Sequence, residues 1–227
     1  MATIAVFAAR TPRSQAYLGA FVRAGLTPDL VIIAGSVPEH DVGKAPVTPR
    51  QVFSESLDET CARMGWKHTH CQADAVNTAE VEECLRSLAP DFLIYSGFGA
   101  QIVRQPILDT CEQIVHIHSG WLPEYRGSTT LYYSWLNENR VGVSAILLDR
   151  EIDHGKILIR KHFPSPPSGV DVDYRYDAEI RADVLHEILV SVRDQGRLPE
   201  MQSQCGDATD YFVIHPVLKH IALLKNG

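Results

Sequence analysis

The sequence predicts an α/β protein with a Rossmann-like, mainly parallel sheet and helices on both of its faces. Three observations support this prediction. Short apolar runs alternate with segments of helical spacing through the first half of the chain. Turn-forming residues separate the two kinds of segment. The 227 residues, 45% of them hydrophobic and 22% charged, suffice for one ordinary globular domain with a sizeable core.

The elements of the first half follow from these patterns. The apolar runs at 4–8, 30–34, 92–95 and 114–117 have the length of buried strands, and 66–70 is a weaker strand. Helical spacing is found over 15–24, from Thr48-Pro49 to about Met64, and from Asn77 to about Leu88. Gly25 has the position of a C-cap residue after the first helix. Because strands and helices alternate, we expect these strands to run parallel.

The second half departs from the alternation. A helix is expected at 131–138, and the runs 143–148 and 156–163 form a predicted hairpin. The Pro- and Ser-rich segment 164–169 breaks regular structure, and 173–192 then has the apolar spacing of one helix. The last segment, 211–224, is apolar with helical spacing late on, and we expect it to pack back onto the domain.

Composition narrows the class of protein. The formal net charge of −7 and the pI of about 5.8, without a basic run, argue against a nucleic-acid partner. No apolar run is long enough to predict a membrane span, and the N-terminus lacks the pattern of a signal peptide. Five scattered cysteines without a CxxC pair indicate reduced thiols in a cytoplasmic protein. We therefore expect neither a nucleic-acid nor a membrane partner, and a homodimer stays open.

The segment 114–155 holds the residues best suited to catalysis. His116 and His118 stand two apart at the end of an apolar run, so on a strand their side chains share one face. Asp153 lies in a turn that follows a second apolar run. Open α/β sheets bind ligands at the carboxyl ends of their strands. Imidazole titrates near neutral pH and a carboxylate can orient it, so this set suits proton transfer.

The same segment resembles the folate-dependent formyltransferase family. The family pattern is Asn-x-His, then a Leu-Pro-x-x-x-Gly loop, then a strand and an x-Asp-x-Gly turn. The chain has Leu122-Pro123-Glu124-Tyr125-Arg126-Gly127 as the loop and Ile152-Asp153-His154-Gly155 as the turn. The family histidine falls on His118 and the family aspartate on Asp153. The family asparagine falls on His116, which is a departure from the pattern.

The resemblance covers roughly residues 1–163, and it implies a catalytic domain there with a helical extension over 164–227 packed on it. It further implies transfer of a formyl group from 10-formyltetrahydrofolate to an amine of a small molecule. His116 and His118 would stabilise the oxyanion, and His118 with Asp153 would handle the proton. The folate would lie between the loops 96–102 and 148–153, in contact with Phe98, Gly99, Ala100, Ile102, Leu148, Asp149 and Arg150. The candidate substrate contacts are Arg10, Ser119, Gly120 and Ser128.

Several alternatives stay open. His116 can replace the amide donor, mark a changed acyl donor or reaction, or mark a chain that binds without catalysing. A non-catalytic folate- or ligand-binding homologue and a formyl-folate hydrolase are the alternative functions. His-x-His with Asp153 and His154 is also a conceivable zinc or iron set. Such spacing is common and the Leu-Pro loop has no place in a metal account, so we predict no metal.

Overall fold

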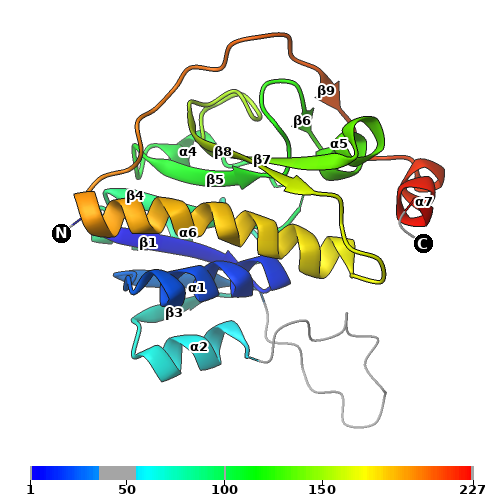
Figure 1. The fold of residues 1–227 in the computed structure, drawn as a ribbon. Coiled ribbons are helices and arrows are strands. Elements are labelled where there is room, and N and C mark those ends of the chain that lie inside the picture. Colours follow the sequence, from blue (N-terminus) through cyan, green and yellow to red (C-terminus); the bar gives the residue numbers. More distant parts are fainter. Residues whose placement is uncertain (1, 36–54, 100, 226–227) are drawn as a thin grey trace.

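The computed structural model describes residues 2–35, 55–99 and 101–225, and its centre is a seven-stranded sheet of order β3-β2-β1-β4-β5-β7-β8 (Figure 1). Five strands run parallel: β1 (Ile4–Ala9), β2 (Leu30–Ala34), β3 (His68–Cys71), β4 (Phe92–Ser96) and β5 (Ile114–His118). An antiparallel hairpin continues the sheet: β7 (Arg140–Leu147) and β8 (Ile157–Pro164). The predicted mainly parallel sheet and its terminal hairpin are confirmed.

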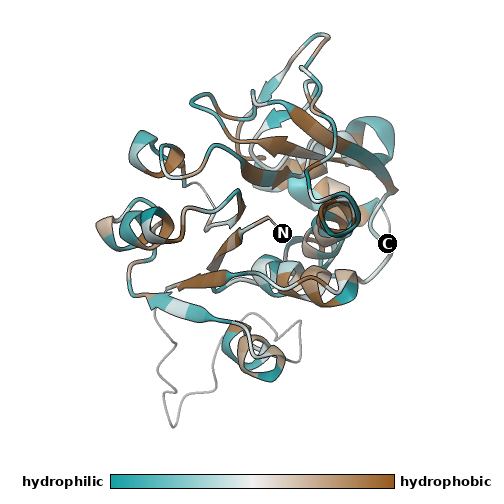
Figure 2. Cartoon of the chain, turned by 90° about the vertical axis from the view of Figure 1, so that its left-hand side faces the viewer, coloured by the Kyte–Doolittle hydropathy of each residue, from teal (hydrophilic) through white to brown (hydrophobic). Residues whose placement is uncertain are grey.

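Helices cover both faces of the sheet, as predicted (Figures 1 and 2). One face carries α1 (Pro12–Ala24) and α6 (Asp177–Gln195), and the other carries α3 (Ala79–Leu88) and α4 (Gln105–Leu108). Alternate residues of β1 enter the two layers, so that Val6 packs on the α1 side and Phe7 on the α3 side. Because both faces are covered, the parallel strands are continuous apolar runs in the sequence.

Local sequence signals fix the ends of the first helices. The N–H of Ser14 donates to the side chain of Thr11 at the start of α1, and Gly25 ends this helix at a φ of +63°. Helix α2 (Leu57–Met64) begins later than predicted, because Ser56 and Glu59 form a capping box. The start predicted at Thr48-Pro49 lies outside the described residues.

The C-terminal part differs from the single helix predicted over 173–192. A π-helical turn, Val172–Tyr176, precedes α6, and the apolar residues of α6 are buried in the same cluster as those of α1. Helix α6 therefore belongs to the main helical layer. Helix α7 (Pro216–Leu224) is less packed than expected, since Val217 and Leu224 are 59% and 63% exposed. The division into a domain over 1–163 and an extension over 164–227 stays a prediction.

Two expectations from composition concern thiols and membranes. The five cysteines are free thiols, and burial raises the pKa of Cys61 to about 11. None of the helices in the described part of the chain combines the length and the apolar composition that a membrane crossing requires.

Candidate active site

The candidate site lies at the carboxyl edge of the parallel sheet. The strand order reverses between β1 and β4, and β5 stands next to β4. Open α/β sheets bind their ligands beside such a reversal. His116 and His118 are the third and fifth residues of β5, whereas Asp153 belongs to the loop between β7 and β8. The fold thus brings together residues that are far apart in the sequence.

His118 and Asp153 form a buried pair. Their Nδ1 and Oδ2 atoms lie 3.4 Å apart, and their side chains are only 6% and 7% exposed. The other ring nitrogen of His118, Nε2, lies 2.7 Å from the carbonyl oxygen of Tyr125. Because a carbonyl oxygen can only accept, Nε2 carries the hydrogen and Nδ1 faces Asp153 with a lone pair. The N–H of Gly127 donates to the carboxylate of Asp153 at 2.9 Å and helps to hold it there.

The turn that presents Asp153 has an unusual backbone. Asp153 adopts a φ of +58°, in the left-handed region that non-glycine residues seldom occupy. A Cβ atom added to Gly155 would lie 1.6 Å from the carbonyl oxygen of Leu147, so the turn can close only with glycine at that position. The side-chain amide of Gln204 donates to the carbonyls of Asp153 and Gly155. Strained residues held in this manner are concentrated at functional sites.

Burial sets the charge of His118. Removal from water lowers the pKa of its imidazole, while Asp153 and the hydrogen bond to Tyr125 oppose the shift. The net direction is downward from an ordinary value of 6.5, so His118 is neutral at pH 7. A neutral imidazole with a lone pair on Nδ1 can accept a proton.

His116 has a buried nitrogen without a partner. Its Nδ1 atom makes no hydrogen bond in the part of the chain that the structure describes. Burial lowers the pKa of His116 well below 6.5, and the charges of Arg181, His118 and Arg13 lower it further. His116 is therefore neutral at pH 7, and one of its nitrogens carries a hydrogen. Buried polar atoms are almost always paired, so this nitrogen calls for a ligand or a water.

The two histidines and Asp153 are close enough to act on one atom. One nitrogen or oxygen from each side chain lies within 4.8 Å of those of the other two. The structure thus brings His116, His118 and Asp153 together, and their catalytic roles stay a prediction. The same spacing could hold a metal ion, and the carbonyl on the far nitrogen of His118 is the kind of partner that metal-binding histidines have. The absence of a metal stays a prediction.

Two partly buried arginines beside the histidines were missed by the sequence analysis. Arg13 of α1 donates to the carbonyl of Gly97, at the end of β4. Arg181 of α6 donates to the carbonyl of Ile117 at 2.6 Å and pairs with Asp177 at 2.9 Å. The apolar spacing over 173–192 predicted only a packed helix and gave no role to Arg181. The i, i+4 relation of Asp177 and Arg181 was the one available signal.

A cavity of about 150 Å³ adjoins His118. It lies between the end of β5, helix α5 (Thr130–Glu138) and the start of α6. Its lining is mostly polar and includes Ser119, Thr130, Asp173, Asp177 and Arg181. A small polar cavity against a candidate base suits the reactive end of a substrate.

The four predicted substrate contacts lie in different surroundings, and only Ser119 is among the residues that line the cavity. Ser119 lines the cavity, and its hydroxyl donates to a carboxylate of α6. Gly120 is buried beside the ring of His118, where an added Cβ atom would lie 2.4 Å from Nε2. Ser128 is exposed. Arg10 is not part of the cavity lining, and its Nη1 lies 2.5 Å from the carboxylate of Asp58 on α2.

The loops predicted to hold the folate follow β4 and β7. Phe98 and Leu148 both pack on the apolar cluster around β4 and α4, and Ile102 is 55% exposed. The other described residues of the set are exposed: Gly99, Asp149 and Arg150. Ala100 lies outside the described residues. Contact of these loops with a folate stays a prediction.

Fold and site together define a Rossmann-like α/β protein with a buried histidine–aspartate pair at the carboxyl edge of its parallel strands. A family model described as formyl transferase matches residues 25–181, which is more than half of the chain. The chain therefore belongs to the formyl transferase family.

Individual relatives agree with this assignment. The chain is 33% identical over 135 residues to a methionyl-tRNA formyltransferase of Trichlorobacter lovleyi, which covers 58% of this chain and 42% of the relative. The chain spans less than half the length of that relative. A phosphoribosylglycinamide formyltransferase from Streptococcus pneumoniae has a TM-score of 0.60 at 19% identity, covering 87% of this chain and all of that one.

An N-formyltransferase from Helicobacter canadensis, solved with folinic acid and dTDP-3-aminofucose, also has a TM-score of 0.60, at 18% identity. The match covers 93% of this chain and 71% of that one. At these identities the solved structures show a shared fold.

Proposed function

We propose that this protein transfers a formyl group from 10-formyltetrahydrofolate to the amine of a small-molecule acceptor. Membership of the formyl transferase family supports the reaction class. The observation that carries the proposal is the buried His118–Asp153 pair with His116 close to it, because the buried Nδ1 of His116 has no partner among the described residues. These groups match the two needs of formyl transfer, which are removal of a proton from the amine and stabilisation of an oxyanion.

His118 serves as the general base in this proposal. The amine nitrogen attacks the formyl carbon, and the electrons of the C=O bond move onto the oxygen. Nδ1 of His118 takes the proton that the amine loses, because its lone pair is free while Nε2 is held by Tyr125. The imidazolium that forms then lies 3.4 Å from the carboxylate of Asp153, which stabilises it. The C=O bond then re-forms as the bond between the formyl carbon and the donor nitrogen breaks. That nitrogen takes the proton, and His118 returns to its neutral form.

His116 serves as the donor to the developing oxyanion. A neutral imidazole still offers one N–H, and the buried Nδ1 atom lacks a partner among the described residues. A donor held in a water-poor site before the reaction costs little reorganisation when the charge appears. This role corresponds to the first of the three interpretations of the departure from the family asparagine.

The donor supplies the formyl group, and apolar side chains of the two loops suit its flat ring. Phe98 and Leu148 rest on one apolar cluster, and the exposed Ile102 offers further apolar surface. The backbone at Gly99 leaves free space beside it, since an added Cβ atom would meet nothing within 4 Å. This arrangement favours a folate lying between the loops 96–102 and 148–153.

The cavity beside His118 supports a small polar acceptor. Hydroxyl and carboxylate groups line it, among them Thr130 and Asp173, and such groups recognise amines and hydroxyls. The net charge of −7 gives no electrostatic help to a polyanion. Because several relatives are named for methionyl-tRNA, that acceptor belongs in the test as the main competitor.

The test follows the fate of the formyl group of 10-formyltetrahydrofolate. The protein is incubated with the donor and a panel of amino sugars, nucleotide-linked amines, amino acids and methionyl-tRNA, and formylated products are identified by mass spectrometry. A formylated small molecule is the expected result. Formyl-methionyl-tRNA would move the acceptor to nucleic acid, and formate released without an amine would indicate a hydrolase. A folate-dependent rise in melting temperature without any product would indicate a binding protein.

A further inference from the structure

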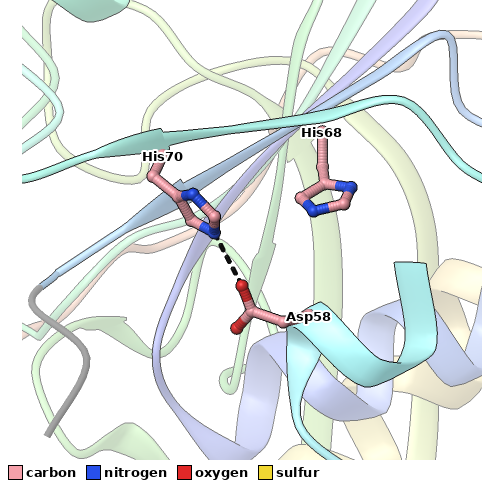
Figure 3. Close-up of side chains that lie close together, drawn as sticks. All are labelled: Asp58, His68 and His70. Carbon is pink, nitrogen blue, oxygen red and sulfur yellow. Dashed lines mark hydrogen bonds and ion pairs between the residues drawn. The ribbon is translucent and has the colours of Figure 1, made fainter. Parts of the chain in front are cut away.

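A second cluster of metal-ligating side chains lies at the other end of the sheet, away from the candidate active site (Figure 3). His68 and His70 are two apart on β3, which is the edge strand, and Asp58 is the second residue of α2. Figure 3 shows the two rings and the carboxylate converging in the space between β3 and α2. One nitrogen or oxygen of each lies within 4.8 Å of the other two. From these contacts we infer that Asp58, His68 and His70 bind a zinc ion.

Hydrogen bonds of His68 leave one of its nitrogens free for a metal. Nδ1 lies 3.1 Å from the carbonyl oxygen of Trp66. Since that oxygen can only accept, Nδ1 carries the hydrogen and Nε2 keeps its lone pair. A carbonyl on the far nitrogen is the usual means by which metal-binding histidines are oriented.

The carboxylate of Asp58 is positioned by a neighbouring arginine. Arg10 donates to its Oδ2 atom at 2.5 Å, and Arg10 is itself fixed by the carbonyl of Gly35. The other oxygen, Oδ1, faces Nε2 of His70 at 2.6 Å. Zinc would enter between Oδ1 and the two imidazoles, and the hydrogen on Nε2 of His70 would leave to solvent or move to Nδ1. Arg10 contacts Oδ1 as well, but only at 3.5 Å, so its charge reduces the affinity for zinc without filling the site.

The chemistry of the set favours zinc over calcium or magnesium. Two imidazoles and one carboxylate are ligands of zinc, whereas calcium and magnesium take oxygen. Three protein ligands leave a fourth position for water. The side chain of His70 is 50% exposed, so an ion can reach the site from solvent. A bound ion would add a second link between the edge strand β3 and α2, beside the contact of His70 with Asp58.

The two metal-ligating clusters of the described residues can be separated by experiment. β3 and β5 are four positions apart in the sheet, or roughly 19 Å at the usual spacing of strands. The untagged protein is treated with a chelator, and zinc binding is measured by isothermal titration and by metal analysis after dialysis. Variants are His68→Gln, His70→Gln and Asp58→Asn. His220→Gln is the matched control, because His220 is an exposed histidine of α7 and belongs to neither cluster.

We expect one zinc per chain, an affinity at least about tenfold weaker in each of the three variants, and no change in the control. Zinc should also raise the melting temperature of the wild type and not that of His68→Gln. His68→Gln removes no ion pair, so it keeps the test valid if Asp58→Asn unfolds. Three results would each overturn the inference: absence of stoichiometric zinc, binding by His68→Gln and His70→Gln that equals the binding by the wild type, or loss of zinc on His116→Gln alone. The cluster would then be a structural ion pair only.

Discussion

The Nδ1 atom of His118 and the carboxylate of Asp153 face each other across 3.4 Å in a buried space, with no hydrogen between them in the neutral form of the histidine. Both atoms are acceptors in that state, because Nε2 of His118 carries the ring hydrogen toward Tyr125. A proton taken up by Nδ1 converts this contact into a charge-assisted hydrogen bond. The pair is thus arranged to stabilise the protonated histidine more than the resting one.

Asp153→Asn should leave the fold intact and remove most of the turnover. The amide keeps an oxygen that can accept from the N–H of Gly127, but it loses the charge that stabilises the imidazolium. Positioned acid–base catalysis contributes about 10²–10⁴ in rate, and we expect a loss within that range in single-turnover formyl transfer. Glu200→Gln, an exposed carboxylate outside the site and its loops, is the control and should retain its rate. A loss below about tenfold for Asp153→Asn would show that the proton is handled elsewhere.

The pH dependence of the rate follows from the lowered pKa of His118. A general base must be neutral, and burial places the pKa below 6.5, so the rate should be level across pH 7–8 and fall only in acid below 6.5. Asp153 opposes the lowering, and therefore the acid limb of Asp153→Asn should lie at still lower pH. The measurement is a pH–rate profile of both proteins. An acid limb above pH 7 in the wild type would mean that His118 is not the base.

The sheet could be predicted because its information is local. Buried parallel strands such as 4–8 and 30–34 are apolar along their whole length, and Gly25 marks a helix end by its own backbone freedom. Helix α2 begins at Leu57, later than predicted, because the reciprocal bonds of Ser56 with Glu59 cap it there, and this capping box was not recognised in the sequence.

The candidate site was only partly predictable. His118 and Asp153 could be paired because each follows an apolar run within a family pattern, whereas Arg13 and Arg181 gave no such signal. Their burial depends on where α1 and α6 cross the ends of β4 and β5, and helical spacing does not contain that information. Arg10 is the predicted substrate contact of the turn after β1, but its guanidinium pairs with the carboxylate of Asp58.

Substitutions of His116 should separate hydrogen bonding from charge. His116 is neutral at pH 7, so His116→Asn, which supplies an amide donor, should keep much of the activity. His116→Ala removes the donor and should lose about 10²–10³ in rate. Because a group that is already neutral has no proton to lose, neither variant should change the slope of the rate between pH 7 and 8.

Single-turnover rates of the three proteins at several pH values give the answer. Equal rates for His116→Ala and the wild type would reduce His116 to a packing residue. An Asn variant far more active than the wild type would favour a chain adapted to another reaction or to binding alone.

Gly155→Ala should destabilise the protein and disable the site together. The added Cβ atom would lie 1.6 Å from the carbonyl oxygen of Leu147, so the turn must shift and carry Asp153 with it. Forced overpacking of this kind costs about 1–3 kcal/mol in the free energy of unfolding, occasionally more. Gly19→Ala is the matched control, since Gly19 lies inside α1 and an added Cβ atom meets nothing within 4 Å. That variant should gain about 0.5–1 kcal/mol by better helix propensity. The measurements are urea denaturation of both variants and single-turnover rates of the folded proteins. A Gly155→Ala variant as stable and as active as the wild type would contradict the close fit of the turn.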